Sequence, residues 1–205
     1  MNDVLSQMTQ HKDVFLALMM GIGLAASCGF RIFVPPLLLG IGLRLGWVPT
    51  AWVSSSFGSL LASPAVLLAL SSATLFEVLA SKIPGIDHIL DGLGAPLAVI
   101  AGTLLSSNML IDIQDPILKY GLGFIAGGGS AGLIHAGNSA LRVLSTKTTG
   151  GLGNPFFSMI ESTLATVLSL VSIFLPLLMI ALLCAVIAVM LWAFKSVFKK
   201  KRPQQ

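Results

Sequence analysis

The chain has 205 residues, of which 55% are hydrophobic and only 10% are charged, and its mean hydropathy is +0.93. Soluble domains carry about 25% charged residues, so this composition excludes an ordinary soluble globular protein. The apolar residues form long continuous runs, which are typical of membrane helices. We therefore expect an all-α fold, a polytopic transmembrane helix bundle.

Polar and charged residues gather at the two ends of the chain. The sequence predicts a polar N-terminal segment at 1–13, a single transmembrane domain at 14–194 and a basic tail at 195–205. Five of the twelve basic residues lie in that tail, directly after an apolar run. We expect a cytoplasmic anchor in a bacterial inner membrane that also touches anionic lipid headgroups, rather than a nucleic-acid-binding arm.

Apolar runs at 14–30 and 32–46 predict two helices that meet near Arg31, the second of them short. The segment around Trp47 and Trp52 predicts a turn at the membrane interface. Further spans are predicted at 51–76, 92–111 and 120–141.

The last apolar run leaves two alternatives open. Either 155–174 and 176–194 are two spans joined at Leu175, or one long helix is kinked at Pro176 and leaves the bilayer. The total is six or seven spans, some short or broken. Seven spans with a cytoplasmic C-terminus place more of the basic residues on the cytoplasmic side.

Two stretches of the chain look like copies of each other and predict an internal repeat, with candidate units at 57–111 and 120–174. Each copy is predicted to end a helix at a lysine, turn through a Gly-Leu-Gly-x-Pro loop and start another helix. The matched segments are 78–82 with 92–96, and 143–147 with 151–155. Repeated apolar segments broken by Gly and Pro point to a substrate site in transporters. The alternative is coincidence in a sequence rich in Leu, Gly and Ala. If the repeat is real, the two loops lie close together.

Five ionisable residues interrupt or end apolar runs and are candidate substrate-binding residues: Arg31, Glu77, His135, Arg142 and Glu161. Such residues at membrane depth are costly, so they are functional candidates by default. The alternative is that Arg and Glu near helix ends extend to the interface, and that a buried neutral His bonds to a carbonyl.

A guanidinium stays charged, so an arginine in the bilayer must reach water, pair with an acid or hold an anion. We therefore expect at least one of Arg31 and Arg142 to point inward, within reach of Glu77, Glu161 or a backbone carbonyl. Asn138 lies one turn from His135 on much the same helix face and joins the candidates.

Asp87, His88 and Asp91 form the densest polar cluster in the sequence. Two carboxylates and an imidazole could bind a divalent cation, the one cofactor that the sequence suggests, or move protons. The alternative is a helix N-terminus, where acidic residues complement the helix dipole.

The second Gly-Leu-Gly-x-Pro segment adds Lys147, Gly151, Gly153 and Asn154 as candidates for binding an anionic group through loop and helix-start amides. Ordinary helix capping by Asn154 explains the same residues.

Three motifs carry a resemblance: Gly29-Phe30-Arg31-Ile32-Phe33-Val34-Pro35, then residues 82–91 (KIPGIDHILD), then residues 144–155 (LSTKTTGGLGNP). Over about residues 14 to 195 the chain resembles a bacterial membrane family known as domain of unknown function 4126. The resemblance implies an integral membrane protein with these motifs at its centre, and it assigns no catalytic or binding role.

We expect a small-solute or anion transporter or permease. The alternatives are a lipid flippase-type protein, an intramembrane metal-dependent enzyme using Asp87, His88 and Asp91, and a structural or accessory membrane subunit. A water-filled cavity at the polar motifs favours transport, whereas dry bonds between helices favour the accessory role.

Overall fold

The computed structural model describes residues 2–81, 86–149 and 154–199, with side chains described over 12–81, 92–146, 156–179 and 181–191. Every regular element in these ranges is helical, as expected. The elements are α1 (Asn2–Cys28), α2 (Val34–Arg44), η1 (Thr50–Trp52), α3 (Ser55–Leu61), α4 (Pro64–Ala80), α5 (Ile86–Ser107), α6 (Pro116–Gly123), η2 (Phe124–Gly128), α7 (Gly129–Thr149), α8 (Asn154–Phe174) and α9 (Pro176–Lys199).

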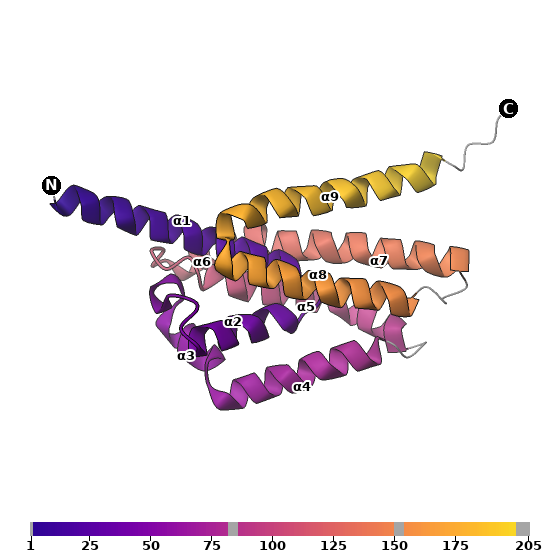
Figure 1. The fold of residues 1–205 in the computed structure, drawn as a ribbon, viewed down its shortest axis with the longest axis horizontal. Coiled ribbons are helices and arrows are strands. Elements are labelled where there is room, and N and C mark those ends of the chain that lie inside the picture. The colour runs from indigo at the N-terminus through magenta and orange to yellow at the C-terminus, as the bar shows by residue number, and fades with distance from the viewer. Residues whose placement is uncertain (1, 82–85, 150–153, 200–205) are drawn as a thin grey trace.

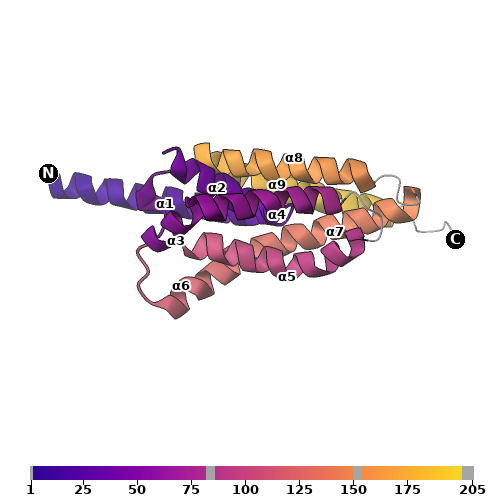
Figure 2. The ribbon, with the colours of Figure 1, turned by 90° about the horizontal axis from the view of Figure 1, so that it is seen from below.

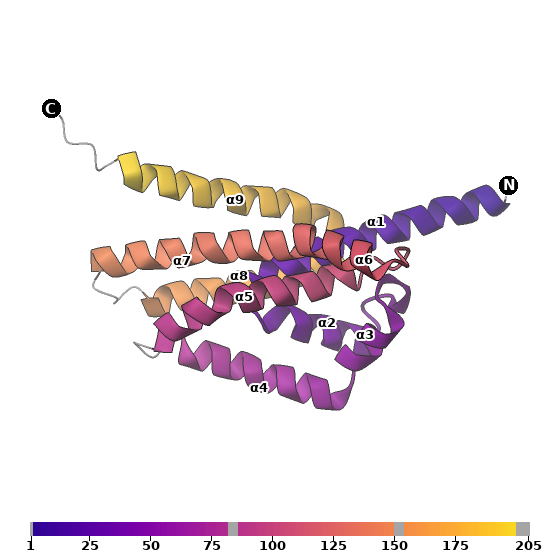
Figure 3. The ribbon, with the colours of Figure 1, turned by 180° about the vertical axis from the view of Figure 1, so that it is seen from behind.

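The helices form an elongated bundle in which most axes follow the long direction of the molecule (Figure 1). α1 lies at the centre and packs against α5, α7, α8 and α9. Its residues Met20, Leu24 and Cys28 are fully buried. α4 and α9 lie on opposite sides of the bundle, as Figures 1 and 3 show. The core is therefore built around the one helix that leads directly into the Arg31 turn.

Proline marks the start of several helices. Pro64, Pro116 and Pro176 each occupy the first position of a helix, where a missing N–H costs nothing. At Leu175 the chain reverses, so that α8 and α9 run side by side in opposite directions (Figure 1). The structure thus decides for two helices in this region and against one long kinked helix.

The expected span at 51–76 is not one continuous helix. The chain forms α3 and α4 instead, and the two helices are bent by 63° relative to each other. Pro64 restricts Ser63 to an extended conformation, and the Ser63 hydroxyl accepts a bond from the amide of Val66 at the start of α4. A proline in an uncharged run thereby separates two helices that composition alone would join.

The predicted loop at Gly92–Pro96 is also wrong, because these residues lie inside α5 with Pro96 in the helix interior. α4 ends at Ala80 and α5 begins at Ile86, so the boundary between the two helices comes earlier in the chain than this motif. Proline is tolerated inside membrane helices because neighbouring groups satisfy the freed backbone. Of the second copy, Gly151 and Gly153 lie outside the described residues, so the repeat and the proximity of its two segments stay predictions.

The glycine run at 127–129 serves close packing of α5 on η2, a π-helical turn that joins α6 to α7. A methyl group on Gly127 would lie 2.4 Å from the carbonyl oxygen of Gly102 and from Cβ of Ser106. One on Gly128 would lie 2.5 Å from Oγ1 of Thr103. The backbones therefore approach too closely for any side chain here.

Two stretches are long and apolar enough to cross a membrane, Pro116–Thr146 and Phe156–Phe174, and the bent pair of α3 and α4 adds a third if it counts as one span. Shorter apolar helices lie at Val34–Arg44, Gly92–Ser107 and Pro176–Leu191. These helices indicate a membrane protein. The expected count of six or seven spans goes beyond them and stays a prediction.

Candidate functional site

Arg31 is buried and lies in a turn between the end of α1 and the start of α2. The turn packs directly on α7: a methyl group on Gly29 would lie 2.6 Å from the carbonyl oxygen of Ala131. The Arg31 side chain is 3% exposed. A non-helical segment at this depth must be surrounded by protein, because its polar backbone groups need partners.

The Arg31 guanidinium joins two other helices. Its Nη1 donates to the carbonyl oxygen of Glu77 on α4 at 3.3 Å, and its Nη2 to Oγ of Ser81 at 3.1 Å. Nη2 also donates to Ser158 on α8, at 3.0 Å to the carbonyl oxygen and 2.6 Å to Oγ. Oε2 of Glu161 lies 3.8 Å from the same nitrogen. Arg31 therefore fixes α4 and α8 to the turn before α2.

The carboxylate of Glu77 caps the start of α2. It accepts hydrogen bonds from the backbone amides of Ile32 and Phe33, at 2.9 and 3.3 Å. Negative charge at a helix N-terminus is favourable because the helix dipole is positive there. Glu77 thus uses its carbonyl oxygen to hold Arg31 and its carboxylate to hold the residues that follow it.

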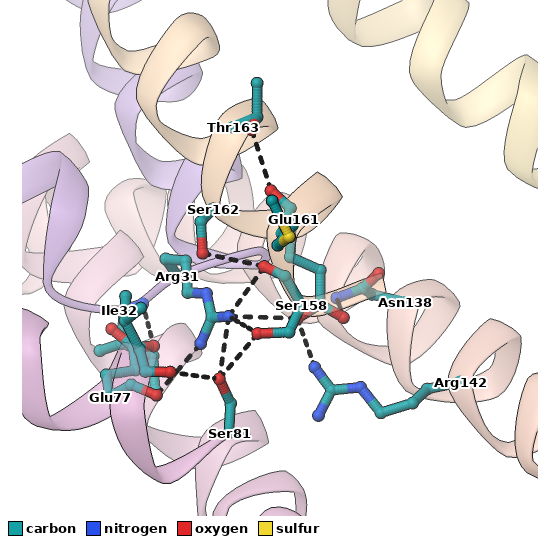
Figure 4. Close-up of polar contacts among 12 residues, drawn as sticks. Arg31, Ile32, Glu77, Ser81, Asn138, Arg142, Ser158, Glu161, Ser162 and Thr163 are labelled. Carbon is teal, nitrogen blue, oxygen red and sulfur yellow. Dashed lines mark hydrogen bonds and ion pairs between the residues drawn. The ribbon is translucent and has the colours of Figure 1, made fainter. Parts of the chain in front are cut away.

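Glu161 on α8 lies between two arginines (Figure 4). Its Oε2 forms an ion pair with Nη2 of Arg142 on α7 and faces Arg31, while Oε1 accepts a hydrogen bond from Nδ2 of Asn138 at 2.8 Å. Glu161 is 2% exposed. Asn138 and Arg142 are one turn apart on α7, so a single helix face supplies both.

Where side chains are described, the buried charged residues are these four and no others: Arg31, Glu77, Arg142 and Glu161. Two positive and two negative charges share one place, so each charge has a compensating neighbour. In a medium of low dielectric constant this clustering avoids the cost of an isolated ion. The prediction that at least one arginine points inward to a carboxylate is confirmed, since both reach Glu161.

A cavity of about 500 Å³ lies beside the charge cluster. Its polar lining includes Arg31, Glu77, Ser81, His135, Asn138, Arg142 and Glu161. Its other lining residues are mainly apolar and include Phe30, Phe33, Phe76, Leu93 and Leu97. The volume falls within the range of about 300–1,000 Å³ that is common for small-molecule sites. One chamber thus offers both charged and apolar walls.

Gly94 shapes this cavity through His135. A methyl group on Gly94 would lie 2.7 Å from Cε1 of the His135 ring and 3.1 Å from its Nε2. The absence of a side chain at Gly94 therefore gives the imidazole its place on the cavity wall, between α5 and α7.

The structure brings six of the sequence candidates together: Arg31, Glu77, His135, Asn138, Arg142 and Glu161. Asp87, His88 and Asp91 lie on the first turns of α5, a helix start as the alternative interpretation expected, and their side chains lie outside the described ones. The same holds for Lys147 at the end of α7 and Asn154 at the start of α8.

No group of three or more His, Cys, Asp or Glu residues is placed to hold a metal ion in the part of the chain whose side chains are described. The candidate set at Asp87, His88 and Asp91 falls outside that part. The chemistry that the described site can do is not metal binding: its guanidinium groups can bind an anion, and its carboxylates can accept a proton.

Sequence reasoning missed Ser81 and Ser158, whose hydroxyls hold Arg31 and lie 2.8 Å from each other. Helical spacing could have found them. Ser81 is four residues after Glu77, and Ser158 is three residues before Glu161, so each serine shares a helix face with a buried acid.

Fold and site together define a helical membrane protein with a buried, charge-balanced polar cluster beside a cavity. A family model described as a domain of unknown function (DUF4126) matches residues 18–196, and the chain belongs to that family. No curated protein and no solved structure matches the chain significantly.

Proposed function

We propose that the protein is a transporter or permease that binds a small anionic solute in this cavity and moves it across a bacterial inner membrane. The observation that carries the proposal is the position of Glu161, which is buried between Arg31 and Arg142 at the cavity wall. This carboxylate occupies the place that an anionic group of a substrate would take.

The mechanism follows from the exchange of one anion for another. Arginine stays charged, so each guanidinium must keep a negative partner throughout the cycle. A substrate carboxylate or phosphate can form charge-assisted hydrogen bonds to Arg142 while Glu161 moves away or takes up a proton. Release of the substrate lets Glu161 return. The resting pair then acts as a gate that opens when a competing anion arrives.

The positions of the two chain termini support an orientation in the membrane that suits a transporter. α1 begins at one end of the bundle and α9 finishes at the other (Figure 1). We propose seven passages along the bundle, with the basic tail in the cytoplasm and the N-terminus on the other side, because this topology puts more basic residues on the cytoplasmic side. Arg142 is seven residues before the end of α7, about 10 Å at 1.5 Å per residue, so the proposed topology implies a site in the cytoplasmic half.

An accessory role is the main competitor, because the bonds among Arg31, Ser81, Ser158 and Glu161 also hold α4 and α8 to the turn between α1 and α2. The cavity favours transport, since a network that only joins helices needs no chamber beside it.

The test uses the purified protein reconstituted into liposomes, with uptake of labelled phosphate, sulfate and short carboxylates measured in parallel. Arg142→Lys keeps the charge but loses the planar two-pronged donor, so we expect uptake of the transported anion to fall about tenfold or more. Arg44→Lys is the matched control, because Arg44 is an exposed arginine at the end of α2 that bonds the carbonyl oxygen of Ala62.

Uptake that is lost in R142K and kept in R44K, with equal insertion and thermal stability, supports the proposal. If no anion of the panel enters above protein-free liposomes, or if R142K transports as well as the wild type, the proposal is wrong.

A further inference from the structure

The cavity reaches the surface of the bundle at α4 and α5. Both helices line it, through Ser72, Ala73 and Phe76 on α4 and through Leu93 and Leu97 on α5. The end of α4 lies near the start of α5, and the two helices diverge from there, as Figure 3 shows, while α4 packs mainly on α2. Seen from below in Figure 2, α4 runs along the near side of the bundle, with α5 beside it. Cavity-lining residues that are exposed on these two helices therefore lie on the side of the bundle.

The rim of the cavity at this surface is apolar and exposed. Phe76 is 67% exposed and Leu93 58% exposed, yet both also line the cavity. In a membrane these side chains face lipid. A fully hydrated anion crossing such a rim would lose its water before reaching a partner. A molecule with an anionic head and an apolar body matches both surfaces: its body fits the apolar rim, and its head fits the arginines.

We propose that the ligand of this cavity is an anionic amphiphile that enters sideways from the bilayer. Its phosphate-type head would bind at Arg31 and Arg142, and its aliphatic chain would pass between Phe76 and Leu93 into the lipid. This inference rests on the proposed function and names the substrate class of the same site.

The depth of the charge cluster fits such a ligand. Glu161 lies seven residues into α8, about 10 Å from the helix start. Bilayers carry a hydrocarbon core of ~30 Å within a total of ~40–45 Å, so the headgroup layer on each side is about 5–8 Å thick. A site about 10 Å from the helix ends lies close to the boundary between headgroups and chains. A lipid phosphate could reach it with little displacement along the membrane normal.

The experiment uses the full chain in phosphatidylcholine liposomes that contain a trace of phosphatidic acid bearing a photoreactive diazirine in its acyl chain. The comparison arm carries the same diazirine in phosphatidylcholine, whose head has no net charge. A third arm adds excess inorganic phosphate as a competitor. Labelled positions are mapped by mass spectrometry, and labelling does not depend on transport.

We expect phosphatidic acid to label the rim on α4 and α5 at least about tenfold more than phosphatidylcholine, with weak competition by inorganic phosphate. Phe76→Ala removes the apolar wall and should lower this labelling about fivefold. Leu68→Ala is the matched control, because Leu68 lies on the same helix, is 70% exposed and does not line the cavity. Arg142→Lys should lower the preference for phosphatidic acid.

Equal labelling by the two lipids, unchanged in R142K, would show an ordinary lipid-facing groove and overturn the inference. Full competition by inorganic phosphate would show that the head alone binds, which overturns the amphiphile but leaves anion transport intact. Labelling as expected without anion uptake would keep the amphiphile site and reject the transport of small solutes.

Discussion

Glu161 is the residue on which the polar cluster depends. It is buried, and its carboxylate compensates Arg142 directly and Arg31 at 3.8 Å. Removing one member of a buried ion pair costs more than the pair itself contributes, because the remaining charge is left without compensation. The stability of the charge cluster therefore depends mainly on the Glu161 side chain.

Glu161→Gln should lower the free energy of unfolding by about 3 kcal/mol, because two buried guanidinium groups lose their shared negative charge. The double variant Arg142→Gln/Glu161→Gln should recover part of that loss, since it also removes one of the positive charges. Detergent-induced unfolding of the purified protein measures both. Additive losses in the double variant would contradict a direct coupling of the two residues.

Gly94→Ala should destabilise the protein by about 1 kcal/mol, because its methyl group would meet the His135 ring, which has to turn away. Gly92→Ala is the control: it lies half a turn earlier on α5, and no atom comes within 4 Å of its Cβ position. A second substitution, His135→Ala, should rescue G94A in a thermal unfolding assay. Equal behaviour of G94A and G92A would contradict the close packing of Gly94 on His135.

Residue chemistry predicted part of the site. The permanent charge of the guanidinium forced Arg31 and Arg142 to find partners, and this argument needs no fold. It could not choose between Glu77 and Glu161, because that choice depends on which helices lie side by side. Glu77 caps α2 with its carboxylate, a role set by the reversal of the chain after α1, which the sequence leaves open.

At the scale of helices, α5 closely approaches the π-helical turn η2. Glycines on both sides allow the backbones to touch, and a π-turn widens the helix by one residue where it meets α5. This contact places α5 against α7 and so sets one wall of the cavity.

Gly127→Ala should lower the free energy of unfolding by about 2–3 kcal/mol, because its methyl group would meet a backbone carbonyl that cannot rotate away. Gly121→Ala, with open space around its Cβ position, should leave stability within about 1 kcal/mol of the wild type. Thermal unfolding in detergent compares the two. A G127A variant as stable as G121A would mean that α5 and η2 are not packed so closely.

The prediction of helix boundaries from proline positions was right where a proline starts a helix. It was wrong where a proline lies in a helix interior or divides an apolar run. Pro176 and Pro116 open helices close to the expected positions. Pro96 does not, because an established helix surrounded by others tolerates a proline that a loop motif would place in a turn. Pro64 did the reverse and divided an uncharged run. The local sequence shows where a proline lies. It does not show whether neighbouring helices satisfy the backbone groups that the proline leaves without a hydrogen bond.

At the scale of the whole molecule, the passage of the chain from one end of the bundle to the other predicts opposite locations for the two termini (Figure 1). In bacteria that express the protein, a cysteine at the exposed Asp112 should react with a membrane-impermeant maleimide added outside, once Cys28 and Cys184 are replaced. A C-terminal green fluorescent protein should fluoresce in the cytoplasm. Labelling at 112 only after lysis, or a dark fusion that is nevertheless inserted, would contradict the seven-passage topology.

The bonds of Arg31 to α8 have a consequence for biosynthesis. Arg31 and Ser158 are 127 residues apart in the chain, and Glu161 follows Ser158 by less than one turn. While the ribosome is still making the middle of the protein, the newly inserted Arg31 turn has none of its α8 partners and no Glu161 to balance its charge. Until α8 has been translated, the partners of Arg31 that the chain already contains include Glu77 on α4 and Ser81 directly after it. Assembly of the centre of the bundle becomes one of the last events of synthesis.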